Sequence, residues 1–170
     1  MTDAILMPRV ADALASHGIQ HEVMACSPDL ADTAAFCDHY GFALDEAANT
    51  IVVTSRKVNP PRYVVCVVLG TTRLDVNGSV RGLMEVKRAS FADAETTTTL
   101  TGMLVGGVTA AGIDGLPIYV DSAVARASRI VMGGGNRTSK IVLAPPELLK
   151  LPGVQVIDGL ARAHEGTSGA

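Results

Sequence analysis

The stretch TIVVTSRKVNPPRYVVCVVLG, residues 50–70, contains two runs of β-branched residues separated by a turn. Runs of four to eight residues rich in Val, Ile, Thr and Tyr are typical of strands. The intervening RKVNPP carries two prolines, which cannot donate to a ladder of backbone hydrogen bonds. The stretch therefore predicts a hairpin over residues 50–55 and 62–70, with a sheet at the centre of the fold.

The segment before this hairpin alternates between helical and extended patterns. Apolar residues recur at roughly helical spacing within the first eighteen residues and predict a helix. Thr2 or Asp3 can cap this helix, and Gly18 is placed to end it. Three further elements are expected before the hairpin: a strand over residues 19–25, a helix over 27–41 and a short helix over 43–49.

After the hairpin the sequence predicts several short strands and helices. A helix capped by Ser90 is expected to end near Gly102. The other expected elements are a strand over residues 72–76, a short helix over 77–86, strands over 116–121, 129–133 and 140–144, a helical turn over 145–151 and a last strand over 154–159. The fold class predicted is α+β, one domain over residues 2–160 with a mixed β-sheet of about six or seven strands flanked by helices. Residues 161–170 are expected to form a flexible tail.

Composition excludes several classes of protein. The net charge of −3 argues against non-specific binding of a long nucleic acid such as DNA, although a local basic patch is compatible with it. The three cysteines show no CxxC spacing, so we expect buried thiols rather than a disulfide framework or a zinc site. The N-terminus does not resemble a signal peptide, and no segment reaches the roughly 20 apolar residues of a membrane span. These features predict a cytoplasmic protein with no membrane partner, and the absence of Trp predicts a core of small β-branched side chains.

Two glycine-rich segments are candidates for a binding loop. GGGNRTSK, residues 133–140, lacks the spacing of a Walker phosphate loop, and its lysine enters an apparent strand, so a hairpin turn is favoured over a phosphate cradle. LTGMLVGGVTAAGIDGLPIYVD, residues 100–121, is either a turn between a helix and a strand or a loop that binds a ligand, and its composition alone allows both.

The residues offer no clear nucleophile. Cys37 and His39 lie two positions apart in an expected helix, where side chains point away from each other. Asp75 and Asp121 stand at strand ends, where an acidic residue is either an ordinary turn acceptor or part of a site. There is no metal-ligating pattern and no pair of carboxylates, so an enzyme of this sequence would act by positioning and through backbone donors.

Four segments, taken in chain order, resemble the successive signatures of the YbaK/ProX family of aminoacyl-tRNA deacylases, which also occurs as an editing domain inserted in bacterial prolyl-tRNA synthetases. They are ANTIVV (48–53), VVLGTTRLDVN (67–77), residues 100–121 and GGGNRTSKIVLAPPEL (133–148), and the resemblance extends over about residues 2–160. It implies a freestanding trans-editing hydrolase that removes a small amino acid such as Cys or Ala from the 3′ end of mischarged tRNA, with tRNA-Pro the expected acceptor. It implies no metal or cofactor, and it makes a synthetase a possible partner.

The physical need for such an enzyme is general. A synthetase pocket separates similar small side chains by only about 10–200-fold, so a second, hydrolytic site must supply the remaining accuracy. The resemblance assigns Gly106 and Gly107 as backbone N–H donors to a carbonyl oxygen, with Asn49 beside them in the catalytic group. The residues that it implies for substrate binding are Thr50, Asp75, Val108, Thr109, Gly112, Asp121 and Arg137.

The sequence departs from the family at two positions. Asn49 stands where the family generally has a lysine, and Ala110 stands where its glycine loop usually has a proline. Lys57 cannot replace the lysine, because eight extended residues place it up to about 26 Å away. Arg73, Arg137 or Lys140 could instead supply the positive charge. Two hypotheses therefore stay open beside the deacylase: a non-catalytic module that binds aminoacyl-tRNA 3′ ends, and a protein-interaction domain.

Overall fold

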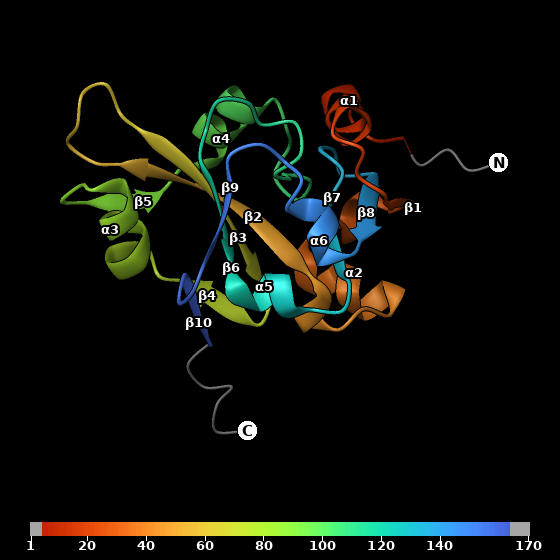
Figure 1. The fold of residues 1–170 in the computed structure, drawn as a ribbon. Helices are drawn as coiled ribbons and strands as arrows, with labels where there is room; N and C mark the ends of the chain where they lie inside the picture. Colours follow the sequence, from red (N-terminus) through yellow and green to blue (C-terminus); the bar gives the residue numbers. More distant parts are fainter. Residues whose placement is uncertain (1–4, 164–170) are drawn as a thin grey trace.

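The computed structural model describes residues 5–163, and the predicted hairpin lies at its centre (Figure 1). Strand β2 (Ala48–Ser55) pairs antiparallel with β3 (Tyr63–Leu69), with Ala48 opposite Leu69 and Thr54 opposite Tyr63. The main sheet has five strands in the order β5-β2-β3-β6-β9. Because β6 (Ile118–Asp121) runs parallel to β3, and β9 (Val154–Ile157) parallel to β6, the sheet is mixed, as predicted for the α+β class.

Strand β3 is buried on both faces and divides the hydrophobic core in two. Successive side chains of a strand point to opposite faces. Val65 and Val67 accordingly pack with helix α1 (Pro8–Ser16) and the strands behind it, whereas Val64 and Cys66 pack against α3 (Arg81–Met84). The expected core of small β-branched residues is confirmed.

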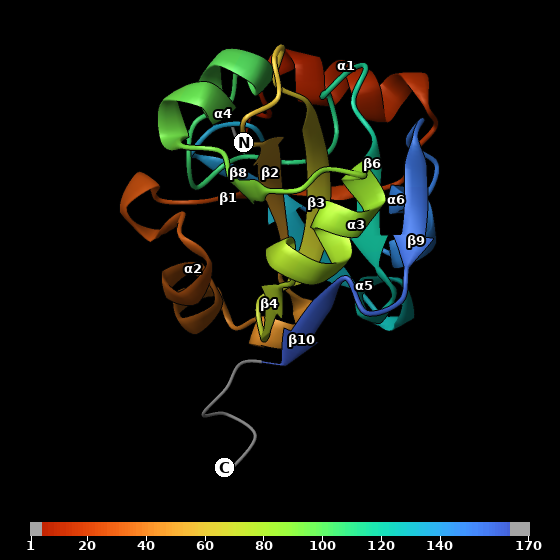
Figure 2. The same ribbon diagram turned by 90° about the vertical axis from the view of Figure 1, so that its left-hand side faces the viewer.

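A second, three-stranded antiparallel sheet has the order β1-β8-β7, formed by β1 (Glu22–Ala25), β8 (Ser139–Leu143) and β7 (Ile130–Gly133). A parallel bridge between Ala47 and Val131 joins it to the start of β2. The segment Gly134–Thr138 therefore closes a hairpin, which confirms that GGGNRTSK is a turn. Figure 2 shows α2 (Thr33–Tyr40) on the same side of β2 as α4 (Ala94–Thr101).

Short elements complete the fold. They are the 3₁₀ turns Pro28–Leu30 and Leu44–Glu46, strand β4 (Thr72–Leu74), a π-helical turn over Val76–Val80, strand β5 (Ala89–Phe91), helix α5 (Ser122–Arg126), helix α6 (Pro145–Leu148) and strand β10 (Ala161–Ala163).

Several predicted boundaries are wrong for physical reasons. Helix α1 begins only at Pro8, whose missing N–H is tolerated in a first turn, so Ile5 and Leu6 precede it. The expected caps Thr2 and Asp3 lie outside the described residues. Ser90 does not cap α4, because it pairs with Thr54 in β5; the Asp93 side chain caps the helix by accepting from the Thr96 N–H at 2.7 Å.

Four larger expectations also need correction. The expected helix over residues 27–41 is a 3₁₀ turn followed by α2, and that over 43–49 shortens to a 3₁₀ turn because β2 begins at Ala48. The main sheet has five strands rather than six or seven, since the others form the second sheet and the β4–β10 pair. Residues 161–163, expected in a flexible tail, form β10; residues 164–170 lie outside the described part of the chain.

The three thiols Cys26, Cys37 and Cys66 are free and buried, as predicted. Burial raises the pKa of Cys66 to about 12. Within residues 5–163, no helix combines the length and apolar character that crossing a membrane requires.

Candidate functional site

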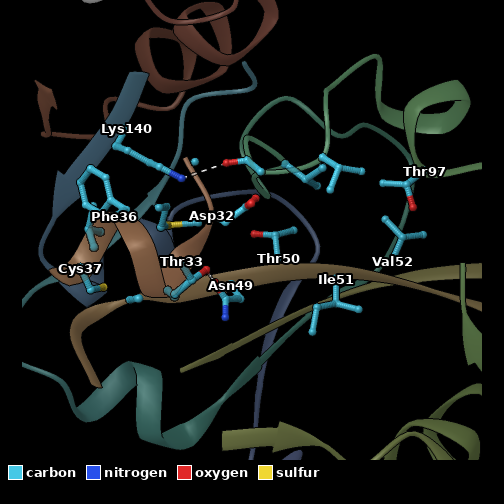
Figure 3. Close-up of a pocket in the computed structure, with 18 of the residues that line it drawn as sticks. Asp32, Thr33, Phe36, Cys37, Asn49, Thr50, Ile51, Val52, Thr97 and Lys140 are labelled. Atoms are coloured by element: carbon cyan, nitrogen blue, oxygen red, sulfur yellow. Dashed lines mark hydrogen bonds between the residues drawn. The ribbon is translucent and has the colours of Figure 1, made fainter. Parts of the chain in front are cut away.

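A pocket of about 540 Å³ opens beside the first half of β2 (Figure 3). Its walls come from α2 and the segment before it, the start of α4, the glycine-rich loop after α4, and strands β7 and β8. A volume of this size is typical of small-molecule sites. Four of the predicted site residues line it: Asn49, Thr50, Gly106 and Val108.

The glycine-rich loop presents a β-turn to this pocket. The Gly107 N–H donates to the Leu104 carbonyl at 2.8 Å, and Gly106, the third residue of the turn, has φ of +91° while Val105 does not have a positive φ. These are the features of a type II turn, which favours glycine at its third position. Gly106 is therefore required by backbone conformation.

Gly107 has a different structural role. Its carbonyl accepts from the Gly135 N–H at 2.7 Å, and a Cβ on Gly107 would collide with the Asn136 carbonyl oxygen. A Cβ on Gly133 would in turn collide with the Gly107 carbonyl oxygen. Glycines recur in both loops because the two backbones pack directly against each other.

This packing corrects one prediction. The Gly107 N–H, expected to donate to substrate, is already bonded to Leu104. The Gly106 N–H has no acceptor among the backbone bonds of residues 5–163. It belongs to the same planar peptide as the Val105 carbonyl, so the two point in opposite directions.

Arg137 holds the turn from outside the pocket lining. Its Nη1 donates to the Val105 carbonyl at 2.8 Å and lies 3.2 Å from Oδ1 of Asp32. Its Nε and Nη2 donate to the Pro28 carbonyl at 3.1 and 2.8 Å. Arg137 thus ties the glycine loop to the segment before α2, and the Val105 carbonyl that it binds fixes the direction of the Gly106 N–H.

Lys140 places a cation inside the pocket. Its Nζ donates to the carbonyls of Ala31 at 2.6 Å and Gly106 at 2.9 Å, and lies 5.3 Å from the centre of the Phe36 ring. The residue is only 7% exposed. Burial lowers the pKa of the Lys140 ammonium, and the nearby Cys26 and Asp32 oppose that shift. An ammonium has three protons, so one remains beyond the two carbonyls.

The side chains of β2 alternate about the strand in Figure 3. Thr50 and Val52 project toward Lys140, whereas Asn49 and Ile51 project from the opposite side of the strand. The Asn49 Oδ1 accepts from the Thr33 hydroxyl at 2.6 Å. The Thr50 Oγ1 has no partner within the described residues although it is inaccessible to solvent. Thr50, rather than Asn49, therefore shares the space of Lys140 and Asp32.

Helix α2 contributes side chains that the sequence did not reveal. Asp32, Thr33, Phe36 and Cys37 line the pocket, although residues 27–41 predict only a helix. Burial raises the pKa of the Cys37 thiol, which disfavours the nucleophilic thiolate. His39 packs edge-on against Tyr40 and is not part of the lining, so no Cys37–His39 dyad faces the pocket. The sequence contains one indication of this part of the pocket, Lys140, because it is a single cation in the otherwise apolar segment KIVLA.

Four residues predicted to bind substrate lie elsewhere. Asp75 accepts from the N–H groups of Gly78 and Ser79 and from Arg162, which makes it a turn acceptor. The Asp121 carboxylate accepts from the Ala161 N–H at 3.3 Å. Thr109 is fully buried, and a Cβ on Gly112 would lie 3.0 Å from the Arg9 carbonyl oxygen. None of the four lines the pocket, and neither does Ala110, which lies in the core.

The other two candidate cations also lie away from the pocket. Lys57 is in the β2–β3 connection, as the length of the strand predicted, and Arg73 is exposed on β4. Among residues 5–163, no three His, Cys, Asp or Glu side chains form a group that could hold a metal ion.

The sequence model of the aminoacyl-tRNA editing domain matches residues 27–151, and the chain belongs to this family. No curated protein matches the sequence.

Solved structures agree on the fold. A candidate trans-editing enzyme for prolyl-tRNA synthetase is 25% identical, with a TM-score of 0.76, and the match covers 89% of this chain and 94% of that one. The hypothetical protein APE2540 gives a TM-score of 0.80 at 21% identity over 91% of this chain and 99% of that one. A protein of Marinobacter aquaeolei VT8, assigned to signal transduction, gives 0.64 at 12% identity over 92% of this chain and 31% of that chain.

Proposed function

We propose that this protein is a freestanding trans-editing hydrolase that cleaves the ester between a small amino acid and the 3′ end of a mischarged tRNA. Cys and Ala on tRNA-Pro are the first substrates to expect, since the likeness to a candidate trans-editing enzyme for prolyl-tRNA synthetase supports that class. The observation that carries the proposal is the pocket in which a Gly106 turn, the Lys140 ammonium and the Thr50 hydroxyl converge.

The chemistry requires a donor for the ester carbonyl. In the reaction, water adds to the carbonyl carbon, the bond to the ribose oxygen breaks, and the proton of the water passes to that oxygen. Negative charge develops on the carbonyl oxygen, where preorganised N–H donors stabilise it. The Gly106 N–H and the third proton of Lys140 are the donors that we assign to it.

Lys140 supplies the positive charge that the family's lysine provides at the position of Asn49. The two carbonyls that bind Lys140 come from the segment before α2 and from the glycine turn, so the ammonium also joins two walls of the pocket. The Thr50 hydroxyl has no partner among residues 5–163 but is inaccessible in the free protein, so it can orient a water or the neighbouring ribose hydroxyl only when substrate entry shifts the side chains around it.

The lining favours a small amino acid. Much of the wall consists of short side chains: Ala47, Ala48, Ala92, Ala94, Val52 and Val105. The volume of about 540 Å³ exceeds the needs of Ala or Cys alone, so it leaves room for the terminal adenosine.

A second candidate function is a module that binds the aminoacyl-tRNA end without hydrolysis. It is favoured by Asn49, which turns away from Lys140 and bonds Thr33. Replacing Asn49 with lysine separates the two: a gain of hydrolysis supports a degenerate enzyme, and a loss shows that Asn49 serves the present site.

The test is a deacylation panel. Purified protein should release amino acid from Cys- and Ala-tRNA-Pro faster than from correctly charged Pro-tRNA-Pro. Turnover of none of a broad set of aminoacyl-tRNAs would refute the hydrolase and leave the binding module.

A further inference from the structure

The β2–β3 connection, α3 and β5 lie at the end of the molecule away from α1 and β1 (Figure 1), and positive charge is concentrated in this part of the sequence. Seven of the fourteen Lys and Arg residues, but only two of the seventeen Asp and Glu, lie between residues 56 and 90. This segment carries a formal charge of +5 in a chain of net charge −3, so the remainder carries −8. The small net charge therefore results from two parts of the chain with large opposite charges.

Six of these cations form one surface, which we call the basic cluster: Arg56, Lys57, Arg62, Arg81, Lys87 and Arg88. They come from the β2–β3 connection, from α3 and from the loop before β5, and all six are exposed. They line two adjoining hollows of about 440 and 510 Å³, in which Glu85 is the one acidic residue among those described.

The charges of the basic cluster are not neutralised by the protein. Within residues 5–163, none of the six forms an ion pair with a carboxylate. Only Arg62 and Arg81 donate to backbone carbonyls, those of Met84 and Lys87. Like charges in close proximity repel, so such a cluster is unfavourable for the free protein and favours an anionic partner.

Two strands connect the basic cluster to the pocket. Residues 49–52 of β2 line the pocket and Arg56 follows β2 directly, about 13 Å beyond Val52 at ~3.3 Å per residue. Ala89 and Ser90 of β5 line one of the two hollows of the basic cluster, whereas Ala92, just after β5, lines the pocket. A few nucleotides of single strand span this separation, so a chain whose end is in the pocket is long enough to reach the cluster.

We propose that the basic cluster binds the phosphate backbone of the acceptor stem while the aminoacylated 3′ end occupies the pocket. This inference rests on the proposed function for the identity of the nucleic acid. Binding through phosphates carries no base specificity, so the cluster strengthens docking of any tRNA, and the pocket selects the amino acid.

The test compares two double variants that remove the same number of charges. Lys87→Gln with Arg88→Gln lies in the basic cluster, whereas Arg126→Gln with Lys150→Gln lies on α5 and after α6. The probe is an uncharged RNA hairpin of the acceptor stem with its CCA end, titrated by fluorescence anisotropy between 50 and 200 mM salt.

The cluster variant should bind the hairpin on the order of tenfold more weakly at 50 mM salt, with a salt slope smaller by about 1.5. The control variant should bind as the wild type does. Equal binding by the cluster variant, equal weakening by both variants, or wild-type binding to phosphatidylserine vesicles but not to the hairpin would each overturn the proposal.

The hairpin carries no ester, so this outcome is independent of hydrolysis. Hairpin binding without deacylation would uphold the docking surface and refute the hydrolase. Hydrolysis of the alanyl ester of adenosine by a wild type that does not bind the hairpin would do the reverse.

Discussion

The pocket and the basic cluster use positive charge in opposite physical settings. Lys140 is a single cation, 7% exposed and bound to two carbonyls, whereas the six cations of the cluster are exposed and have no carboxylate partners among residues 5–163. Salt screens a buried charge little, whereas exposed charges more than about 10 Å apart are largely screened from each other at 0.1 M salt. We therefore expect the first to affect the reaction and the second to affect encounter and docking.

The largest effect should come from removing the buried cation. Lys140→Met should lower kcat/KM for Ala-tRNA-Pro by on the order of 10²–10³, the usual result of losing one donor to a developing oxyanion. Lys150→Met removes an exposed lysine paired with Glu147 and is the matched control, with an expected change of less than about twofold. Equal activity of Lys140→Met and the wild type would refute the role of Lys140.

The glycine turn should follow. Gly106→Ala places a Cβ against Nη1 of Arg137 at a φ of +91°, so the turn and its N–H must move. We expect a loss in kcat/KM of about 10²-fold, together with ~1–3 kcal/mol of stability lost to the strained backbone. Gly115→Ala is the control, since φ is +76° there and nothing lies within 4 Å of the added Cβ. It should lose stability alone, and a matching loss of activity would assign the effect to strain.

A change at Gly107, such as Gly107→Val, would be a less specific test of the glycine turn. Its Cβ would collide with the Asn136 backbone, so the variant would disturb the packing of the two loops as well as the pocket.

The pH dependence of stability gives a smaller effect. Because burial lowers the pKa of Lys140 in the folded protein from 10.5, the unfolded chain binds the proton more tightly. Between the lowered pKa and 10.5 the unfolding free energy of the wild type should therefore rise with pH relative to Lys140→Met, with a slope of at most about 1.4 kcal/mol per pH unit. Urea unfolding of both proteins from pH 7 to 10.5 measures the difference, and a fall would contradict the burial of a charged ammonium.

The smallest effect concerns Asp75. As the acceptor of two backbone N–H groups, it should stabilise the fold by about 1 kcal/mol. Asp75→Ala should lower the unfolding free energy by that amount and leave kcat/KM unchanged. A loss of activity without a loss of stability would restore the substrate-binding role that the sequence suggested.

Local patterns predicted the elements whose causes are local. The β2–β3 hairpin follows from its β-branched runs and two prolines, and the turn at GGGNRTSK from glycines followed by the apolar strand KIVLA. The sequence predicts a helix cap at Ser90, because the pairing of Ser90 with Thr54, 36 residues earlier, leaves no local signal. Strand β10 is similar, since its partner β4 lies almost ninety residues earlier.

Only the locally determined part of the candidate site could be predicted from the sequence. The glycines of the loop were visible in the sequence, but their mutual packing with Gly133 and Asn136 was not. Lys140 reaches Ala31 and Gly106 across separations of 109 and 34 residues, which no spacing rule reports. The direction of Asn49 depends on the register of β2, in which one residue decides the face.

The most direct measurement compares kcat/KM on Ala-tRNA-Pro and on the alanyl ester of adenosine for the wild type, Lys140→Met and the Lys87→Gln, Arg88→Gln double variant. We expect Lys140→Met to lose activity on both substrates by a similar factor, and the double variant to lose activity only on the tRNA. Activity of Lys140→Met on the adenosine ester equal to that of the wild type would refute the role of Lys140 in stabilising the oxyanion.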